Sequence, residues 1–293
     1  MNPRPDLAPE CLLAPPAGDG RPPLADVYSA FASLGEAGWR TIEITSQPAA
    51  DGRMLPILAY VSAEDVDIVL IGGIHGREPA GPLALARSVP HIVEQGRTQG
   101  LLVMPLLNPW GYLHDERYGP SGQSVTDSDH ALGRRSEAAC AEAAAIIGFV
   151  MGAVRIRRGA GVLDLHEDPL YEAPGDGVAA RGSYLYVIGA RAMDQPACRR
   201  GLDCLDGARL PLVRTGTTRF GETLVDGVVL DSADGSIDEL LAVRLGCSPV
   251  ITVENTLRAP NEPPLSVRVD QYVEVLEAFL GASAGEVPCA RRS

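Results

Sequence analysis

Short apolar runs that alternate with helical segments constrain the fold of this chain more than any other feature. The runs have the length of buried strands and are bounded by glycine, proline or polar residues. They are Val66–Ile71, Gly100–Leu107, Gly161–Leu165, Tyr184–Ile188 and Pro249–Val253. Strands of this kind, separated by helices, are typical of an α/β fold with helices on both faces of a central sheet. We therefore expect a mostly parallel mixed sheet flanked by helices.

Apolar residues at helical spacing predict six helices. The predicted helices are Leu24–Leu34, Pro79–Arg97, 136–156, Ala192–Leu205, Ser236–Leu245 and Val269–Phe279. Ahead of the first buried run, Trp39–Thr45 and Leu55–Val61 alternate like the two strands of a hairpin. Residues 108–135 are poor in pattern and rich in Gly, Ser, Asp and His, and we expect a long loop there. Loops of this length in compact domains are usually functional or disordered.

The two ends of the chain lack such patterns. Residues 1–23 contain seven prolines and no periodicity, which predicts an extended or disordered arm. Residues 284–293 are expected to form a tail, so the folded domain is predicted at residues 24–283. The N-terminus has no apolar stretch typical of a signal peptide, and no run approaches the roughly 18 residues of a membrane span. We expect a cytoplasmic protein.

Charge and composition exclude several functions. The net charge of −13 argues against a nucleic-acid partner and against binding to an anionic membrane surface. All 25 basic residues are arginine, so a Schiff-base lysine and a phosphate loop that ends in GK[ST] are both excluded. The six cysteines are scattered and none forms a CxxC pair, so no structural zinc cluster is expected. The pairing of Cys198 with Cys204 and the oligomeric state stay open.

Histidine and glutamate residues stand where three of the predicted strands end. His75 and Glu78 follow the first apolar run, His166 follows the third, and Glu254 follows the fifth. In an open α/β sheet, the ligand crevice lies beyond the carboxyl ends of the strands, so these side chains can converge. Two imidazoles and one carboxylate leave a fourth position open, which is typical of catalytic zinc. We therefore predict one Zn²⁺ held by His75, Glu78 and His166, with Glu254 left as the general base.

Two other enzyme classes fit less well. The glycines at positions 72, 73 and 76 do not form the GxGxxG pattern of dinucleotide binding, and no acidic ribose partner is evident about 20 residues later. A serine hydrolase would need a GxSxG elbow, which is absent from the sequence.

Four motifs, in this order, resemble the zinc carboxypeptidase superfamily, which also contains the succinylglutamate desuccinylase and aspartoacylase-like deacylases. They are His75-Gly76-Arg77-Glu78, Asn108-Pro109-Trp110-Gly111 followed by Arg117, Asp164-Leu165-His166, and Thr252-Val253-Glu254-Asn255. The resemblance covers roughly residues 40–280 and implies the carboxypeptidase-like fold. It also implies zinc on the three ligands above and Glu254 as base. Arg117 would polarise the scissile carbonyl and hold its oxyanion, a role that suits a permanent cation with several donors.

The sequence departs from the family where the substrate is selected. A DLNR-type motif that grips a terminal carboxylate is replaced by residues 125–130, and its arginine is missing. By motif position we expect Asn108, Asp127, Asp129 and His130 at the substrate. The two aspartates could face a cationic group instead, or another arginine could grip an anion. The alternatives are Arg134, Arg135, Arg181, Arg214 and Arg219. Where the family carries a tyrosine before the last strand, this chain has Leu240 and Leu241.

These observations predict a zinc-dependent hydrolase that cleaves an amide or peptide bond in a small peptide-like substrate. One alternative is a deacylase that acts on an N-acyl amino acid or a related metabolite. Another is a non-catalytic binding protein that retains the fold.

Overall fold

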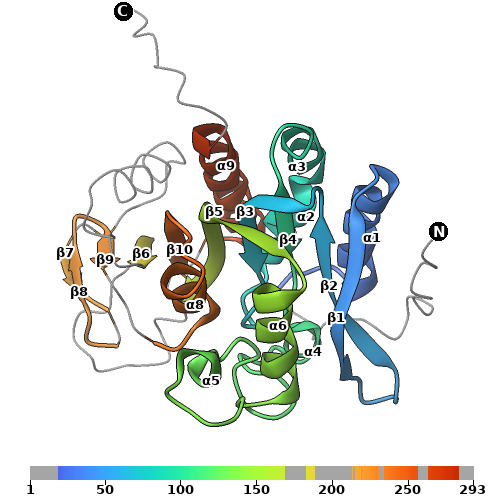
Figure 1. Ribbon diagram of the computed structural model, residues 1–293, viewed down its shortest axis with the longest axis horizontal. Helices are drawn as coiled ribbons and strands as arrows, with labels where there is room; N and C mark the ends of the chain where they lie inside the picture. Colours follow the sequence, from blue (N-terminus) through green and yellow to red (C-terminus); the bar gives the residue numbers. More distant parts are fainter. Residues whose placement is uncertain are drawn as a thin grey trace, which may run out of the picture.

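A computed structural model describes residues 19–168, 183–188, 213, 215–218, 220–230, 234–256 and 263–283 of the 293-residue chain. Within these residues, ten strands form one mixed sheet with helices on both faces (Figure 1). The predicted α/β fold is confirmed. The expected helix at 192–205, the tail at 284–293, and Cys198 and Cys204 lie outside the described residues, as does the N-terminal arm up to residue 18.

The sheet is parallel at its centre and largely antiparallel toward its ends. Its order is β1-β2-β4-β3-β5-β10-β6-β9-β8-β7. The parallel centre consists of β4 (Leu101–Met104), β3 (Asp65–Gly72), β5 (Arg155–Asp168) and β10 (Val250–Thr256). On one side lie β2 (Met54–Val61) and β1 (Arg40–Pro48), and on the other lie β6 (Tyr184–Ile188), β9 (Val228–Leu230), β8 (Thr223–Val225) and β7 (Thr215–Thr217). Among these outer strands, only β6 and β9 pair in parallel.

Both faces of β3 are buried, which explains its continuous apolar sequence. Ile68 and Leu70 pack into a core with α1 (Leu24–Glu36), α2 (Ala80–Arg87), α3 (Val89–Gln95) and α9 (Leu265–Ser283). Val69 and Ile71 pack into a second core with α6 (Ala141–Gly152) and α8 (Ile237–Val243). The two groups of helices lie on opposite sides of the sheet in Figure 1.

Several element boundaries differ from expectation for local reasons. The helix expected at Pro79–Arg97 is two helices that meet at Ser88, because Pro90 in the first turn of α3 has no N–H to continue the α2 ladder. Strand β5 begins at Arg155, well before the predicted Gly161. Its first residues include Arg155 and Arg157, whose exposed side chains form ion pairs with Asp65 on β3. Because these charged residues interrupt the apolar pattern, the first part of β5 does not appear as an apolar run.

The loop expected at 108–135 contains two short helices, α4 (Pro109–His114) and α5 (Asp129–Leu132). Helix α4 starts at a proline, and the side chain of Asn108 caps it by accepting a hydrogen bond from the Gly111 N–H at 2.9 Å. Helix α8 is capped by Ser236, whose hydroxyl accepts from the Glu239 N–H. None of the helices in the described part of the chain is long and apolar enough to cross a membrane.

The sheet topology brings the carboxyl ends of β3, β5 and β10 together. Gly72 at the end of β3 lies opposite Leu165, and Glu254 on β10 lies opposite His166. Groups that lie far apart in the sequence therefore meet at one edge of the sheet.

Candidate metal centre

His75, Glu78 and His166 converge on one buried spot. One ligand atom from each residue lies within 4.8 Å of the others. The His75 Nδ1 is 2.8 Å from Glu78 Oε1, and the His166 Nδ1 is 3.1 Å from Glu78 Oε2. The two Nδ1 atoms are 3.0 Å apart. Two imidazole nitrogens and a carboxylate that face one another in a buried site form a donor set that fits Zn²⁺.

The charges around this cluster favour a cation. Burial lowers the pKa of His75 to about 3, so this imidazole is neutral and can donate its lone pair. Burial would raise the pKa of Glu78, but the two histidines outweigh it and hold that pKa well below its ordinary value. Burial likewise opposes the charge of His166, yet Asp164 and Glu78 raise its pKa well above the usual range. The carboxylates around His166 thus stabilise positive charge, whether it is a proton or a metal ion.

A second set of groups contacts the predicted ligands, and contacts of this kind commonly orient histidines that bind a metal. Asp164 is fully buried on β5, two residues before His166, and its Oδ2 lies 3.3 Å from the His166 Nε2. This favours the tautomer that leaves Nδ1 available to a metal. Glu78 is held by the Glu167 N–H, which donates to its Oε2 at 3.1 Å. The Tyr272 hydroxyl, from α9, donates to the His166 carbonyl.

Asp164 lies near a second buried carboxylate, that of Asp238. Asp238 was not identified from the sequence. Asp238 on α8 accepts a hydrogen bond from the Thr252 hydroxyl at 2.7 Å, and Thr252 lies opposite Asp164 in the sheet. Burial and the charge of Asp164 raise the pKa of Asp238 well above its ordinary value. The two-residue spacing of Asp164 and His166 on a strand could have identified Asp164, because such residues share a face. No sequence signal marks Asp238, since its place depends on how α8 packs.

Arg117 lies beside the ligands. Its guanidinium donates to Glu78 Oε1 at 3.0 Å, and 23% of its side chain is exposed. Burial opposes its charge, but Glu78 and Glu254 raise the pKa of Arg117 above its already high value. The guanidinium also lies 5.8 Å from the ring centroid of Tyr118, an exposed residue whose ring meets that of His75 edge-on.

Glu254 stands on β10 directly opposite His166 and is partly exposed. The charge of Glu254 raises the pKa of Arg117. The structure thus brings the predicted base to the same edge of the sheet as the predicted ligands.

Asn108 supports the loop that carries Arg117. It is fully buried, and its Oδ1 accepts from Gly111 N–H and from the Gln47 amide. Its Nδ2 donates to the Arg117 carbonyl at 3.2 Å. The side chain predicted to lie at the substrate therefore contacts the backbone of the Arg117 loop.

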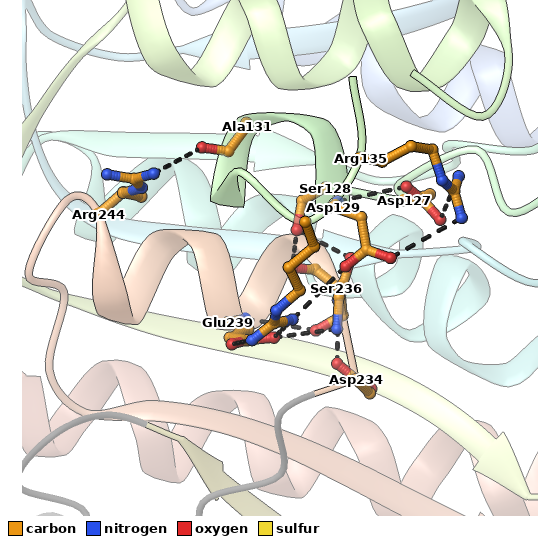
Figure 2. Close-up of polar contacts among 11 residues, drawn as sticks. Asp127, Ser128, Asp129, Ala131, Arg135, Asp234, Ser236, Glu239 and Arg244 are labelled. Atoms are coloured by element: carbon orange, nitrogen blue, oxygen red, sulfur yellow. Dashed lines mark hydrogen bonds and ion pairs between the residues drawn. The ribbon is translucent and has the colours of Figure 1, made fainter. Parts of the chain in front are cut away.

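Residues 127–135 form an ion-pair network with α8 (Figure 2). Asp127 and Asp129 lie 3.2 and 3.8 Å from the Arg135 guanidinium, and Arg134 pairs with Glu239 through both of its terminal nitrogens. The Ser128 hydroxyl lies within hydrogen-bonding distance of the carbonyls of both Gly235 and Ser236, at 2.8 and 2.6 Å.

Within the part of the chain that the structure describes, this network does not extend to the predicted metal ligands. Among the contacts of the described residues, none joins Asp127, Asp129 or His130 to the three ligands. Leu240 and Leu241 are buried in α8. Arg181, Arg214 and Arg219 lie outside the described residues.

Several solved structures have a similar fold. A candidate metallopeptidase from Shewanella amazonensis is similar over 87% of this chain and 91% of its own, with a TM-score of 0.68 and 21% identity. A metallo-carboxypeptidase from Burkholderia cenocepacia is similar over 89% of this chain and 69% of its own, with a TM-score of 0.58 and 13% identity. An aspartoacylase family protein from Mesorhizobium loti is similar over 82% of this chain and 67% of its own, with a TM-score of 0.50 and 20% identity.

At the level of sequence, no protein-family model matches the chain, and a search of curated proteins found no match. The likeness is therefore one of fold, and identities of 13 to 21% carry no more than that. The chain has the fold shared by metallopeptidases, metallo-carboxypeptidases and aspartoacylase-like proteins, as its four motifs predicted.

Proposed function

We propose that this protein is a metal-dependent hydrolase that cleaves an amide or peptide bond in a small peptide-like substrate. The observation that carries the proposal is the convergence of His75, Glu78 and His166 within 4.8 Å, with Arg117 beside them. The three residues would hold one Zn²⁺. When bound, zinc supplies a Lewis acid for the substrate carbonyl and lowers the pKa of a water molecule.

Each remaining residue has a role that follows from its position. Glu254 is the general base: its carboxylate takes the proton of the attacking water and passes it to the leaving amine nitrogen. Arg117 stabilises the negative charge that develops on the carbonyl oxygen, because its own charge is permanent and is held in place by Glu78. Asp164 keeps the ring of His166 in the orientation that presents Nδ1.

A deacylase acting on an N-acyl amino acid is the second candidate. Arg134 and Arg135, which stand near the position of the family's carboxylate grip, already pair with Glu239, Asp127 and Asp129. This weakens the case for recognition of a free C-terminal carboxylate by that segment. The fold is also similar to that of the aspartoacylase family protein. A non-catalytic binding protein is disfavoured, since the three predicted ligands and the predicted base are all present.

The proposal is tested by metal analysis together with a Glu254→Gln variant. We expect about one equivalent of zinc in both proteins and hydrolysis only in the unchanged one. Glu94→Gln is a matched control, because Glu94 is an exposed residue on α3. Hydrolysis that survives Glu254→Gln, or a protein that binds no metal, would refute the mechanism.

A substrate panel separates the two hydrolase candidates. It contains peptides with a free carboxylate, the same peptides amidated, and N-acyl amino acids. A strict need for a free C-terminal carboxylate indicates a carboxypeptidase with a different anion grip. Cleavage of N-acyl amino acids alone indicates a deacylase.

A further inference from the structure

Arg21 is a buried cation from the segment that precedes the first helix. Only 1% of its side chain is exposed. Its Nη1 donates to the carbonyls of Gly76, at 3.2 Å, and Tyr112, at 2.8 Å. Its Nη2 donates to Asp115 Oδ1 at 2.7 Å, and its Nε donates to Asp19 Oδ2 at 2.5 Å. A buried guanidinium is costly unless its donors are satisfied, and here all three nitrogens have partners.

Three of the four partners of Arg21 belong to the two loops that build the candidate centre, and the fourth, Asp19, belongs to the same segment as Arg21. Gly76 follows His75 in the turn that carries two of the metal ligands, which we call the ligand turn (residues 75–78). Tyr112 and Asp115 belong to α4 and its end, which lead directly into Arg117. The ligand turn and this second loop also touch each other, because the Gly76 N–H donates to the Arg117 carbonyl at 3.3 Å. One guanidinium therefore bonds to both loops at their junction.

The segment around Arg21 is fixed from the other side as well. The guanidinium lies over the ring of Tyr112, with the central carbon 5.2 Å from the ring centroid. The Tyr112 hydroxyl donates to the Pro22 carbonyl at 2.8 Å. Arginine suits this place because its planar fork reaches several acceptors at once, which a lysine ammonium cannot do with the same geometry.

We propose that Arg21 is a positioning residue that holds the ligand turn and the Arg117 loop in register. The inference deepens the proposed function and rests on it. It makes residues 19–23 part of the site's support, although the sequence places them in a proline-rich arm. Loss of the guanidinium frees the Gly76 carbonyl and lets the ligand turn move relative to Arg117.

The test replaces Arg21 by Met, which keeps an unbranched apolar stem and removes every donor. Arg53→Met is the matched control. Arg53 forms the same local contacts with Asp51 that Arg21 forms with Asp19, through its backbone N–H at 3.1 Å and its Nε at 2.8 Å. Arg53, however, lies in the turn between β1 and β2.

Two measurements are made on each full-length protein. Amide hydrogen exchange reports the protection of Gly76, whose N–H bond joins the two loops, against that of core amides in β3 and β5. Chelator competition reports the zinc dissociation constant. For Arg21→Met we expect faster exchange at Gly76 with unchanged core protection, and zinc affinity about 10 to 100-fold weaker, as for other residues that orient metal ligands. Arg53→Met should match the unchanged protein in both.

The outcomes separate this inference from the proposed function. Gly76 protection that is unchanged in Arg21→Met overturns the positioning role, as does an equal loss of protection throughout the core. If Arg21→Met does not fold, Asp115→Asn removes one charged acceptor at a partly exposed site and should accelerate exchange at Gly76 in the same sense. A failure of the proposed function would appear in the unchanged protein, as absence of zinc binding, while the exchange result still decides the role of Arg21.

Discussion

The close approach of the ligand turn to α4 leads to a sharp prediction for Gly76→Ala. A Cβ at Gly76 would lie 2.0 Å from the carbonyl carbon of Gly111 and 2.2 Å from the Tyr112 nitrogen, both backbone atoms that cannot rotate away. Ordinary contact begins at 3.4 Å, so the two loops must separate by the difference between 3.4 and 2.0 Å, about 1.4 Å. A displacement of this size at a reacting centre costs about 100-fold in rate.

We therefore expect Gly76→Ala to lower kcat/KM by about 100-fold and to weaken zinc binding. Gly148→Ala on α6 is the matched control, since a Cβ there meets nothing within 4 Å. Replacing a mid-helix glycine by alanine should stabilise the fold by about 0.5–1 kcal/mol. The assay is steady-state hydrolysis on the best substrate of the panel, with thermal melts of both variants. If Gly76→Ala retains activity and zinc affinity, the two loops are not held as tightly as this reasoning requires.

Three further predictions test the surroundings of the site. Burial and the charge of Asp164 raise the pKa of Asp238 in the folded state, so the folded protein holds a proton that the unfolded chain releases above about pH 3.9, and stability should fall as the pH rises toward the folded pKa. Asp238→Asn should make this fall shallower in urea titrations from pH 4 upward, while Glu167, whose burial raises its pKa to about 7, keeps its own contribution of the same sign. A slope that Asp238→Asn leaves unchanged would exclude Asp238 as a source. Removal of metal with a chelator should lower the melting temperature, with excess zinc at 1,000 times its dissociation constant restoring about 4 kcal/mol. His166→Ala should lose this response and His91→Ala keep it; a response that survives in His166→Ala would place the metal elsewhere. Arg268→Met breaks a buried pair with Glu167 (2.6 Å, 3% and 0% exposed) and should destabilise the fold by about 3–5 kcal/mol in denaturant titrations, with partial recovery in the double variant with Glu167→Gln. A loss below 1 kcal/mol would show that the pair is not intact in solution.

The central strands and the predicted ligands were accessible from the sequence because each rests on a local pattern. Strand β3 is buried on both faces, so its apolar run is unbroken. His75 and His166 follow such runs, and parallel neighbours place their ends together. The first half of β5 was not predicted, because it contains Arg155 and Arg157 instead of apolar residues. Both form ion pairs with Asp65 on the neighbouring strand β3. The hairpin strands β7, β8 and β9 are three residues long, too short to show a period.

The supporting groups could not be predicted, for a different reason. Arg21 is one arginine among 25, and only the packing of the segment against α4 makes it buried. Asp238 resembles any acidic residue in the first turn of a helix, where it would ordinarily face solvent. Asn108 matched a family motif, yet its side chain caps α4. Patterns along the chain identify the ends of strands, whereas these roles depend on contacts between segments far apart in sequence.

The contacts that Tyr272 and Arg268 on α9 make with β5 have a consequence for synthesis on the ribosome. All three predicted ligands have been synthesised once residue 166 is made, but Tyr272 and Arg268, which contact the His166 carbonyl and the Glu167 carboxylate, are made about a hundred residues later. A nascent chain that stops before α9 therefore carries every predicted ligand without the helix that contacts His166 and Glu167. We expect the centre to mature only at the end of translation, so that a half-made chain has little means to capture zinc in its final geometry.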